Sequence, residues 1–202
     1  ISHSDPQNKL IDIIIDFNNF DFPGTEGFVP KNFEHSTKNC EKLLSLMKKQ
    51  SFLKLKIPKG LPDITFIKEV NSLTKLQIRL IDENLDLSPI KDMPNLKSLN
   101  LLSSKLDLKK LSQLENIEQL SLAIDGDSLD GLSMRNLLTL KLYPGSISDI
   151  SSVENCSNLK HIYIDSNKIS DIVPLSKLKN LESIGASDNQ IEDICPIQNL
   201  VK

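Results

Sequence analysis

Apolar residues recur along the chain in one pattern, Leu-x-x-Leu-x-Leu, in which Ile or Phe replaces some of the leucines. Seven copies begin at Phe52, Leu73, Leu96, Ile117, Leu137, Leu159 and Leu181, so consecutive copies are 21, 23, 21, 20, 22 and 22 residues apart. An eighth copy, Leu10/Ile13/Ile15, begins 42 residues before Phe52, which is two periods. A constant period of this length indicates that the fold is a stack of similar turns.

Each copy predicts one short strand, because side chains alternate between the two faces of a strand and the leucines of the pattern then share a face. No single turn can bury this apolar face alone, whereas neighbouring turns that stack their strands into a parallel sheet can. The sequence therefore predicts an α/β solenoid with a parallel sheet on one side.

The segment after the strand is also repeated. The two most regular copies read NKISDIVPLSKL at residues 167–178 and NQIEDICPIQNL at residues 189–200. The Asn side chain can bond the backbone where the chain leaves the strand, and the Pro restricts the return segment to a non-strand conformation. We expect the apolar residues of this segment to fill the interior from the convex side, namely Ile169, Ile172, Leu175 and Leu178.

These residues resemble the 22-residue unit of bacterial leucine-rich repeat proteins of the internalin type. The similarity is close over residues 159–200, recognisable over 52–158 and loose before 52. It implies a right-handed leucine-rich-repeat solenoid with a parallel concave β-sheet, a mostly irregular or 3-10 convex side and an N-terminal helical cap, which binds partner proteins on the concave sheet. The turn Asn is missing at 104–105, 125–130 and 144–145, where we expect less regular turns.

The chain divides into two predicted parts. Residues 1–50 form an N-terminal cap with a first strand (10–16), a Gly/Pro loop (20–30) and a helix at about 37–49. Residues 51–202 form the repeat solenoid, with about seven repeats. Leu200 occupies an interior position and only two residues follow it, so we expect either that the native chain continues or that the last edge pairs with something.

Composition removes several classes of protein. The chain has 202 residues, a net charge of −3, 39% hydrophobic residues and seven Gly, which disfavours a disordered chain and a glycine-rich nucleotide-binding fold. No apolar run reaches the ~18–20 residues needed to cross a bilayer. Cys40, Cys156 and Cys195 are odd in number and widely spaced, so they predict neither a disulfide framework nor a metal-ligand pair.

Candidate chemistry is sparse. The three histidines lie in unrelated places and no nucleophile motif occurs, so we predict that the chain is not an enzyme and needs no cofactor. Asp125, Asp127 and Asp130 resemble a calcium loop, but no Glu closes it at the expected distance. We expect an acidic turn there, no metal, and a buried, inert thiol at Cys156.

The repeat register predicts which residues line the concave face. The central column reads Lys56, Gln77, Asn100, Ser121, Lys141, Tyr163 and Gly185; the column before it reads Lys54, Lys75, Ser98, Gln119, Thr139, His161 and Ser183; the column after it reads Pro58, Arg79, Leu102, Ala123, Tyr143, Asp165 and Ser187. Both tyrosines of the chain fall on this face, and Tyr is favoured at interfaces, although strands also tolerate aromatic residues. The predicted partner-binding cluster is therefore Tyr143 and Tyr163 with Lys141, His161 and Asp165.

Charge is uneven along the predicted solenoid. Residues 51–80 carry six basic and two acidic residues, and residues 115–202 carry seven basic and thirteen acidic residues. The concave basic residues at the N-terminal end, which a partner of matching charge would contact, are Lys54, Lys56, Lys75 and Arg79. A solvated surface without a partner is the alternative.

The sequence thus predicts a non-enzymatic module that binds a protein partner of unknown identity on its concave face. Two alternatives stay open: the recognition half of a larger bacterial effector whose enzymatic domain lies outside this chain, or polyanion binding by the basic end. The negative net charge disfavours nucleic acid. The resemblance implies a bacterial protein that is secreted or at the cell surface, whereas unpaired cysteines are compatible with the cytoplasm.

Overall fold

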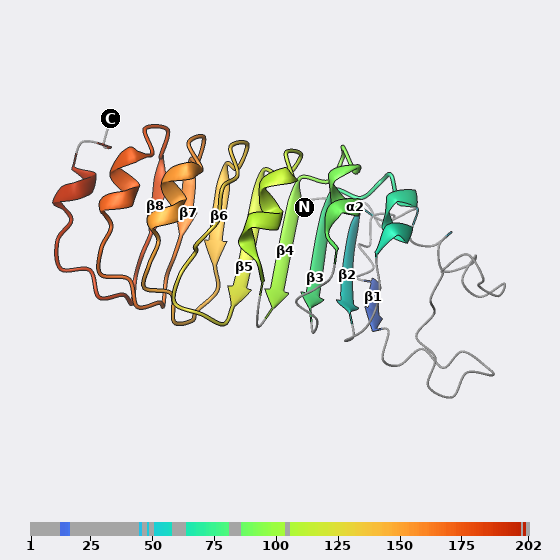
Figure 1. Ribbon diagram of the computed structural model, residues 1–202, viewed down its shortest axis with the longest axis horizontal. Coiled ribbons are helices and arrows are strands. Elements are labelled where there is room, and N and C mark those ends of the chain that lie inside the picture. Colours follow the sequence, from blue (N-terminus) through green and yellow to red (C-terminus); the bar gives the residue numbers. More distant parts are fainter. Residues whose placement is uncertain are drawn as a thin grey trace, which may run out of the picture.

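The computed structural model describes residues 13–16, 45, 48, 51–57, 64–80, 86–103, 106–198 and 200, with the backbone alone for residues 13–16, 52–57, 66, 80 and 103. Eight parallel strands form one sheet, and their order in the sheet is their order in the chain (Figure 1). The strands are β1 (Ile13–Asp16), β2 (Phe52–Ile57), β3 (Lys75–Leu80), β4 (Ser98–Ser103), β5 (Gln119–Ile124), β6 (Thr139–Leu142), β7 (His161–Tyr163) and β8 (Ser183–Gly185). The predicted solenoid sheet is confirmed.

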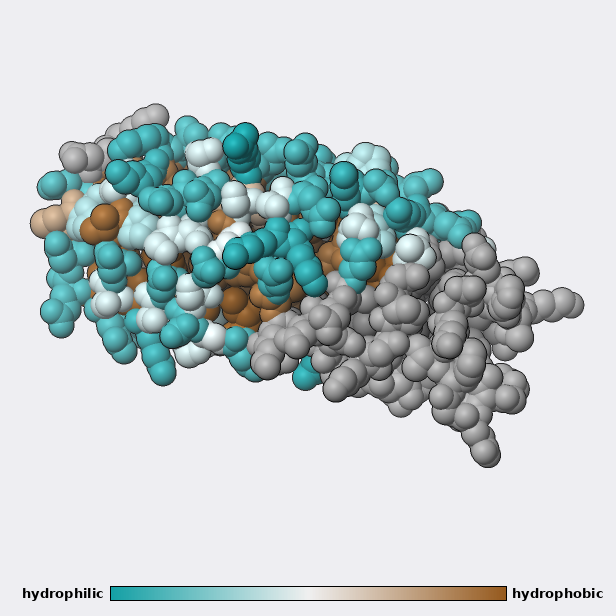
Figure 2. All heavy atoms as spheres, in the orientation of Figure 1, coloured by the Kyte–Doolittle hydropathy of each residue, from teal (hydrophilic) through white to brown (hydrophobic). Residues whose placement is uncertain are grey.

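The inward residues of neighbouring strands pair directly with one another. Leu76 pairs with Leu99, Leu99 with Leu120, Leu120 with Leu140, and Leu140 with Ile162. All five are at most 1% exposed. The core is therefore a ladder of aliphatic side chains. On the face that Figure 2 shows, apolar residues of the described part appear in patches between hydrophilic ones.

The register of β2 differs from the sequence prediction. The repeat pattern placed Leu55 opposite Leu76, whereas the structure pairs Leu53 with Leu76 and Leu55 with Ile78. The motif fits β2 twice because Leu53, Leu55 and Ile57 alternate, and only strand pairing decides between the two fits. A shift of two residues keeps the face but moves Lys54 to the central column and Lys56 to the third.

The convex side consists of short helices, as the repeat pattern predicts. They are η3 (Thr65–Glu69), α2 (Ser88–Lys91), η4 (Leu108–Gln113), η5 (Ser151–Asn155), η6 (Val173–Lys177) and η7 (Cys195–Ile197), of which α2 is α-helical and the others are 3-10 helices. The four interior residues predicted from 167–178 are at most 3% exposed. Among the described residues, no helix lies between β5 and β6.

An aspartate precedes five of these helices and holds the chain at the turn. Its carboxylate accepts the backbone N–H two residues later, at 2.8 to 3.1 Å. The residues are Asp86, Asp107, Asp149, Asp171 and Asp193. In the turn without a helix, Ser128 takes this place and its Oγ accepts the N–H of Asp130 at 3.0 Å. The repeated Asp of the motif thus closes a side-chain turn at the start of the helix. Asp107 is itself the N-cap residue, and the other four lie one residue before the N-cap.

The turn asparagines bond the backbone as predicted. Asn167 is 7% exposed, and its Nδ2 donates to the carbonyls of Ile164 and Asp165 at 3.3 and 3.0 Å. Its Oδ1 accepts the N–H of Ile147 from the preceding turn at 3.2 Å. The turn at 144–145, which lacks its own Asn, is therefore supported by the Asn of the next turn.

Most of the predicted cap lies outside the described residues. The Gly/Pro loop at 20–30 has no described residue, and only Ser45 and Lys48 of the predicted helix at 37–49 are described. Within the predicted first strand, the structure places β1 at Ile13–Asp16.

Candidate protein-binding face

Three columns of outward residues cross the concave sheet, and strand pairing defines them. The central column is Lys54, Gln77, Asn100, Ser121, Lys141, Tyr163 and Gly185. The first column is Phe52, Lys75, Ser98, Gln119, Thr139, His161 and Ser183. The third column pairs Lys56, Arg79, Leu102 and Ala123, and Tyr143, Asp165 and Ser187 continue it just beyond the ends of the later strands.

Tyr143 is half-buried and fixed by a residue two strands away. Its hydroxyl accepts a hydrogen bond of 2.8 Å from Nδ2 of Asn100, so the ring extends from the end of β6 across β5 to β4. Lys141 lies beside it, with Nζ 5.9 Å from the ring centroid, a distance at which a cation and an aromatic face attract one another. The structure therefore brings Tyr143 and Lys141 together, with Asn100 as a third member.

Tyr163 lies on the other side of this cluster. Its side chain is exposed, and a Cβ atom on Gly185 would lie 3.0 Å from Cδ1 of its ring, so the ring rests against β8. Gly185 permits this approach because it has no side chain. The two tyrosines thus lean in opposite directions across the sheet, toward β4 and toward β8, and they contact different neighbours.

Asp165 and His161 complete the predicted cluster but contribute differently. The Oδ1 atom of Asp165 accepts the backbone N–H of Ser187 at 2.8 Å, so this carboxylate joins two neighbouring turns. His161 is half-buried in the first column, where it pairs directly with Thr139 of the neighbouring strand β6. Asp165 is therefore partly a structural residue, which the sequence prediction did not foresee.

Basic residues of the concave face are not matched by acidic ones. Lys75 and Arg79 on β3 and Lys141 on β6 are exposed, and in the described chain none of the three has an ion-pair partner. Lys54 and Lys56 hold concave positions in β2, but their side chains lie outside the described part of the structure. Of the thirteen acidic residues after residue 114, only Asp165 stands in a concave column. The acidic excess of residues 115–202 thus lies mostly outside the concave columns, whose basic residues are concentrated on β2 and β3.

Among the described residues, four ion pairs join neighbouring turns away from the concave columns. Their N–O distances are 2.6 to 3.0 Å, and the pairs are Lys48–Glu69, Lys68–Asp92, Lys97–Glu118 and Lys160–Glu182. These side chains are 40 to 56% exposed, so each pair contributes little to stability.

The aspartates at 125, 127 and 130 are exposed in an irregular turn. Within the described ranges, no group of three or more His, Cys, Asp or Glu is arranged to hold a metal ion. Cys156 is fully buried, and burial raises the pKa of its thiol, partly offset by a hydrogen bond from the Met134 backbone. Cys195 is exposed, and the hydrogen bond and negative charge of Asp193 raise the pKa of its thiol.

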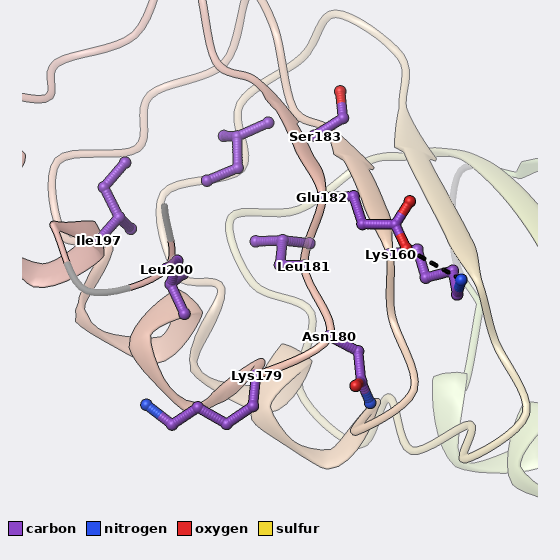
Figure 3. A pocket seen from close by; sticks show the side chains of 9 residues that line it. Lys160, Lys179, Asn180, Leu181, Glu182, Ser183, Ile197 and Leu200 are labelled. Carbon is purple, nitrogen blue, oxygen red and sulfur yellow. Dashed lines mark hydrogen bonds and ion pairs between the residues drawn. The ribbon is translucent and has the colours of Figure 1, made fainter. Parts of the chain in front are cut away.

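A hollow of about 540 Å³ lies at the last described turn (Figure 3). Leu181, Ile197 and Leu200 border it, and the Lys160–Glu182 ion pair lies at its far side. Ile194, one turn after the 3% exposed Ile172, is 69% exposed. The apolar surface of this turn is therefore uncovered in the described chain, and the expected continuation or pairing of this edge stays a prediction.

Sequence reasoning missed a second asparagine position, directly before the first leucine of the strand motif. Its Nδ2 donates to carbonyls of the preceding turn: Asn95 to Asn71, Asn116 to Ile90, Met93 and Leu96, Asn136 to Glu115, and Asn180 to Ser157. The repeated Asn-Leu or Asn-Ile pair was visible in the sequence as a signal. These residues hold the turns, and so the concave columns, in register.

Comparisons with known proteins agree with this architecture. The family pattern "Leucine Rich repeats (2 copies)" matches residues 157–199. The crystal structure of internalin C2 from Listeria monocytogenes is 30% identical, with a TM-score of 0.53, over 78% of this chain and 80% of that chain. The chain belongs to the internalin-type leucine-rich repeat proteins.

Two further solved structures are similar. Internalin F from Listeria monocytogenes is 25% identical over 78% of this chain and 60% of that chain, with a TM-score of 0.43. A leucine-rich repeat protein from Leptospira interrogans shares the fold at 20% identity and a TM-score of 0.51, over 81% of this chain and 50% of that chain. A search of curated proteins finds no match.

Leucine-rich repeat proteins generally mediate protein–protein interactions. None of the described helices is long and apolar enough to span a membrane.

Proposed function

We propose that this internalin-type chain is a non-enzymatic recognition module that binds a protein partner on its concave face, with Tyr143 and Lys141 at the centre of the contact. The observation that carries the proposal is the hydrogen bond from Asn100 to the Tyr143 hydroxyl. It holds a half-buried aromatic ring in one position before any partner arrives, so little conformational entropy is lost on binding.

The surroundings of Tyr143 support the same role. The exposed ammonium of Lys141 stands beside the ring, and Leu102 and Ala123 precede it in the third column, half-buried and uncharged. An aromatic anchor with a charged neighbour and apolar surface around it is the usual composition of a binding hot spot. Tyr163 and His161 on β7 form a second contact region, separate from that of Tyr143.

The extent of the sheet is sufficient for a stable interface. Eight strands at ~4.8 Å give about 34 Å between the first and the last, which accommodates the ~800 Å² per partner of a standard interface.

The test is a titration with a partner obtained by affinity capture. Tyr143→Ala is expected to weaken binding by at least about 2 kcal/mol, about thirtyfold, because it removes a preorganised anchor. Val173→Ala is the matched control, because Val173 is 52% exposed on the convex side and its truncation leaves the concave face unchanged. Equal affinities of the Tyr143 variant and the wild-type chain would place the interface elsewhere.

A further inference from the structure

We infer that the partner segment which lies on the concave face is acidic and extended, and that it crosses the strands from Arg79 on β3 to Lys141 on β6. This inference rests on the proposed function, because it names the chemistry of the partner for that same face. Its first basis is that basic side chains outnumber acidic ones in the concave columns, although the whole chain is acidic. The whole chain carries −3, yet the described side chains of the three columns include Lys75, Arg79 and Lys141 against Asp165 alone.

The second basis is that these cations are free and the acid is not. Among the described residues, Lys75, Arg79 and Lys141 have no ion-pair partner, whereas Asp165 accepts a backbone hydrogen bond from Ser187. A basic surface without internal neutralisation attracts acidic groups and repels basic ones, which steers association and selects the partner.

The third basis is the spacing of the charges. Arg79 and Lys141 are three strands apart, about 14 Å at ~4.8 Å per strand, and their columns are two residues, ~7 Å, apart along the strands, which together give about 16 Å. An extended chain advances ~3.3 Å per residue, so two carboxylates about five residues apart reach both cations. Lys75 lies at the opposite end of β3 from Arg79, so it adds to the field without standing on this path.

The strip between the two cations is uncharged. It is formed by Asn100 and Leu102 on β4 and by Ser121 and Ala123 on β5. Because the strip has no charges of its own, Arg79 and Lys141 are the two charged ends that an acidic segment contacts.

A peptide probe tests this inference directly. The probe is a fluorescently labelled Glu-Glu-Gly-Ser-Gly-Glu-Glu peptide, and the control peptide has Lys in place of every Glu. Fluorescence anisotropy is expected to show saturable binding of the acidic peptide alone, weaker by about tenfold or more when salt rises from low to physiological concentration.

Two double variants with the same change in net charge locate the binding site. R79S/K141S is expected to weaken peptide binding at least about tenfold, because it removes both ends of the strip. K91S/K177S, which removes two exposed lysines of the convex helices α2 and η6, is expected to change it less than about twofold. No binding to the wild-type chain, or equal losses in the two double variants, would overturn the inference.

Three further outcomes distinguish an acidic protein segment from a polyanion, and this inference from the proposed function. Heparin that binds more tightly than the peptide and loses affinity in R79S/K141S would replace the acidic protein segment by a polyanion. A protein partner that depends on Tyr143 but is indifferent to salt and to R79S/K141S would overturn the acidic segment and leave the concave site standing. A partner indifferent to both sets of variants would overturn the proposed function itself.

Discussion

Nδ2 of Asn100 donates a 2.8 Å hydrogen bond to the hydroxyl of Tyr143, although 43 residues separate the two in the sequence. The bond joins β4 to the end of β6 and passes over β5. It is a polar contact on the concave face, so its strength and its effect on binding can be measured separately.

A double-mutant cycle measures this bond. We expect Asn100→Ala and Tyr143→Phe to have non-additive effects on the free energy of unfolding, with a coupling of about 0.5–1.5 kcal/mol, the usual net value of one hydrogen bond. Urea denaturation of the two single variants and the double variant gives this coupling. Additive effects would mean that the bond does not hold the tyrosine in solution.

The register of the core predicts the effect of a buried charge. Leu140 and Ile162 are both 0% exposed, so Leu140→Asp or Ile162→Asp would bury an unpaired carboxylate and cost several kcal/mol or more. Thermal melting by circular dichroism is expected to show loss of the cooperative transition. The outward Lys141→Asp is the control, and it should melt close to wild type. Native-like melting of either core variant would contradict the assigned faces.

The side chain of Asn167 is expected to stabilise the folded protein. Its amide bonds the carbonyls of its own turn and the N–H of Ile147 in the preceding turn, and the side chain is buried. Asn167→Ala removes the partner of the Ile147 N–H and of the Asp165 carbonyl, whereas the Ile164 carbonyl keeps its bond from Asn189. We therefore expect a loss of about 2–3 kcal/mol. Asn180→Ala removes one exposed hydrogen bond and should lose about 1 kcal/mol or less. Similar losses of unfolding free energy in the two variants would mean that the buried hydrogen bonds of Asn167 stabilise the fold no more than one exposed hydrogen bond does.

The aspartates that precede the helices predict that the protein loses stability in acid. Hydrogen bonds from Ser88 lower the pKa of Asp86, and those from Ser151 lower the pKa of Asp149, chiefly from its side chain in the first case and its backbone N–H in the second. Because each carboxyl has a lower pKa folded than unfolded, its contribution is complete above the unfolded value of about 3.9 and is lost as pH falls through the folded value.

The measurement is the free energy of unfolding between pH 6 and pH 2. We expect it to be nearly flat above about pH 5 with respect to these groups and to fall below about pH 4. Asp86→Asn together with Asp149→Asn should flatten the acid limb, because neither amide titrates. If the free energy of unfolding of the double variant fell with pH as steeply as that of the wild-type chain, these two aspartates would be excluded as the cause of the fall.

Much of the fold could be predicted from the sequence because one period repeats. Inward positions such as Leu140 and Ile162 follow from strand alternation, and the turn asparagine Asn167 follows from its fixed place after the strand. The register of β2 could not be predicted, because Leu53, Leu55 and Ile57 satisfy the motif in two ways. That choice depends on which strand residues of β3 are opposite, and this is a long-range property.

The candidate site could be predicted only as a list of columns. Column membership places Tyr143 and Tyr163 on one face, but the direction in which each ring leans depends on Asn100 in one case and on the absent side chain of Gly185 in the other. The dual role of Asp165 likewise depends on the backbone of the next turn. These contacts of Tyr143, Tyr163 and Asp165 with other turns do not repeat along the chain, unlike those of the asparagines, so only the structure shows them.

The bond from Asn100 to Tyr143 also bears on the curvature of the solenoid. Flattening the sheet moves the outward atoms of β4 and β6 apart more than it moves the core atoms, and a hydrogen bond of 2.8 Å between these two strands cannot stretch far. A partner that requires a flatter surface must therefore break this bond, whereas a partner with a matching convex outline leaves it intact. At the proposed concave interface, this one side-chain contact would discriminate between partners by the radius of their surface.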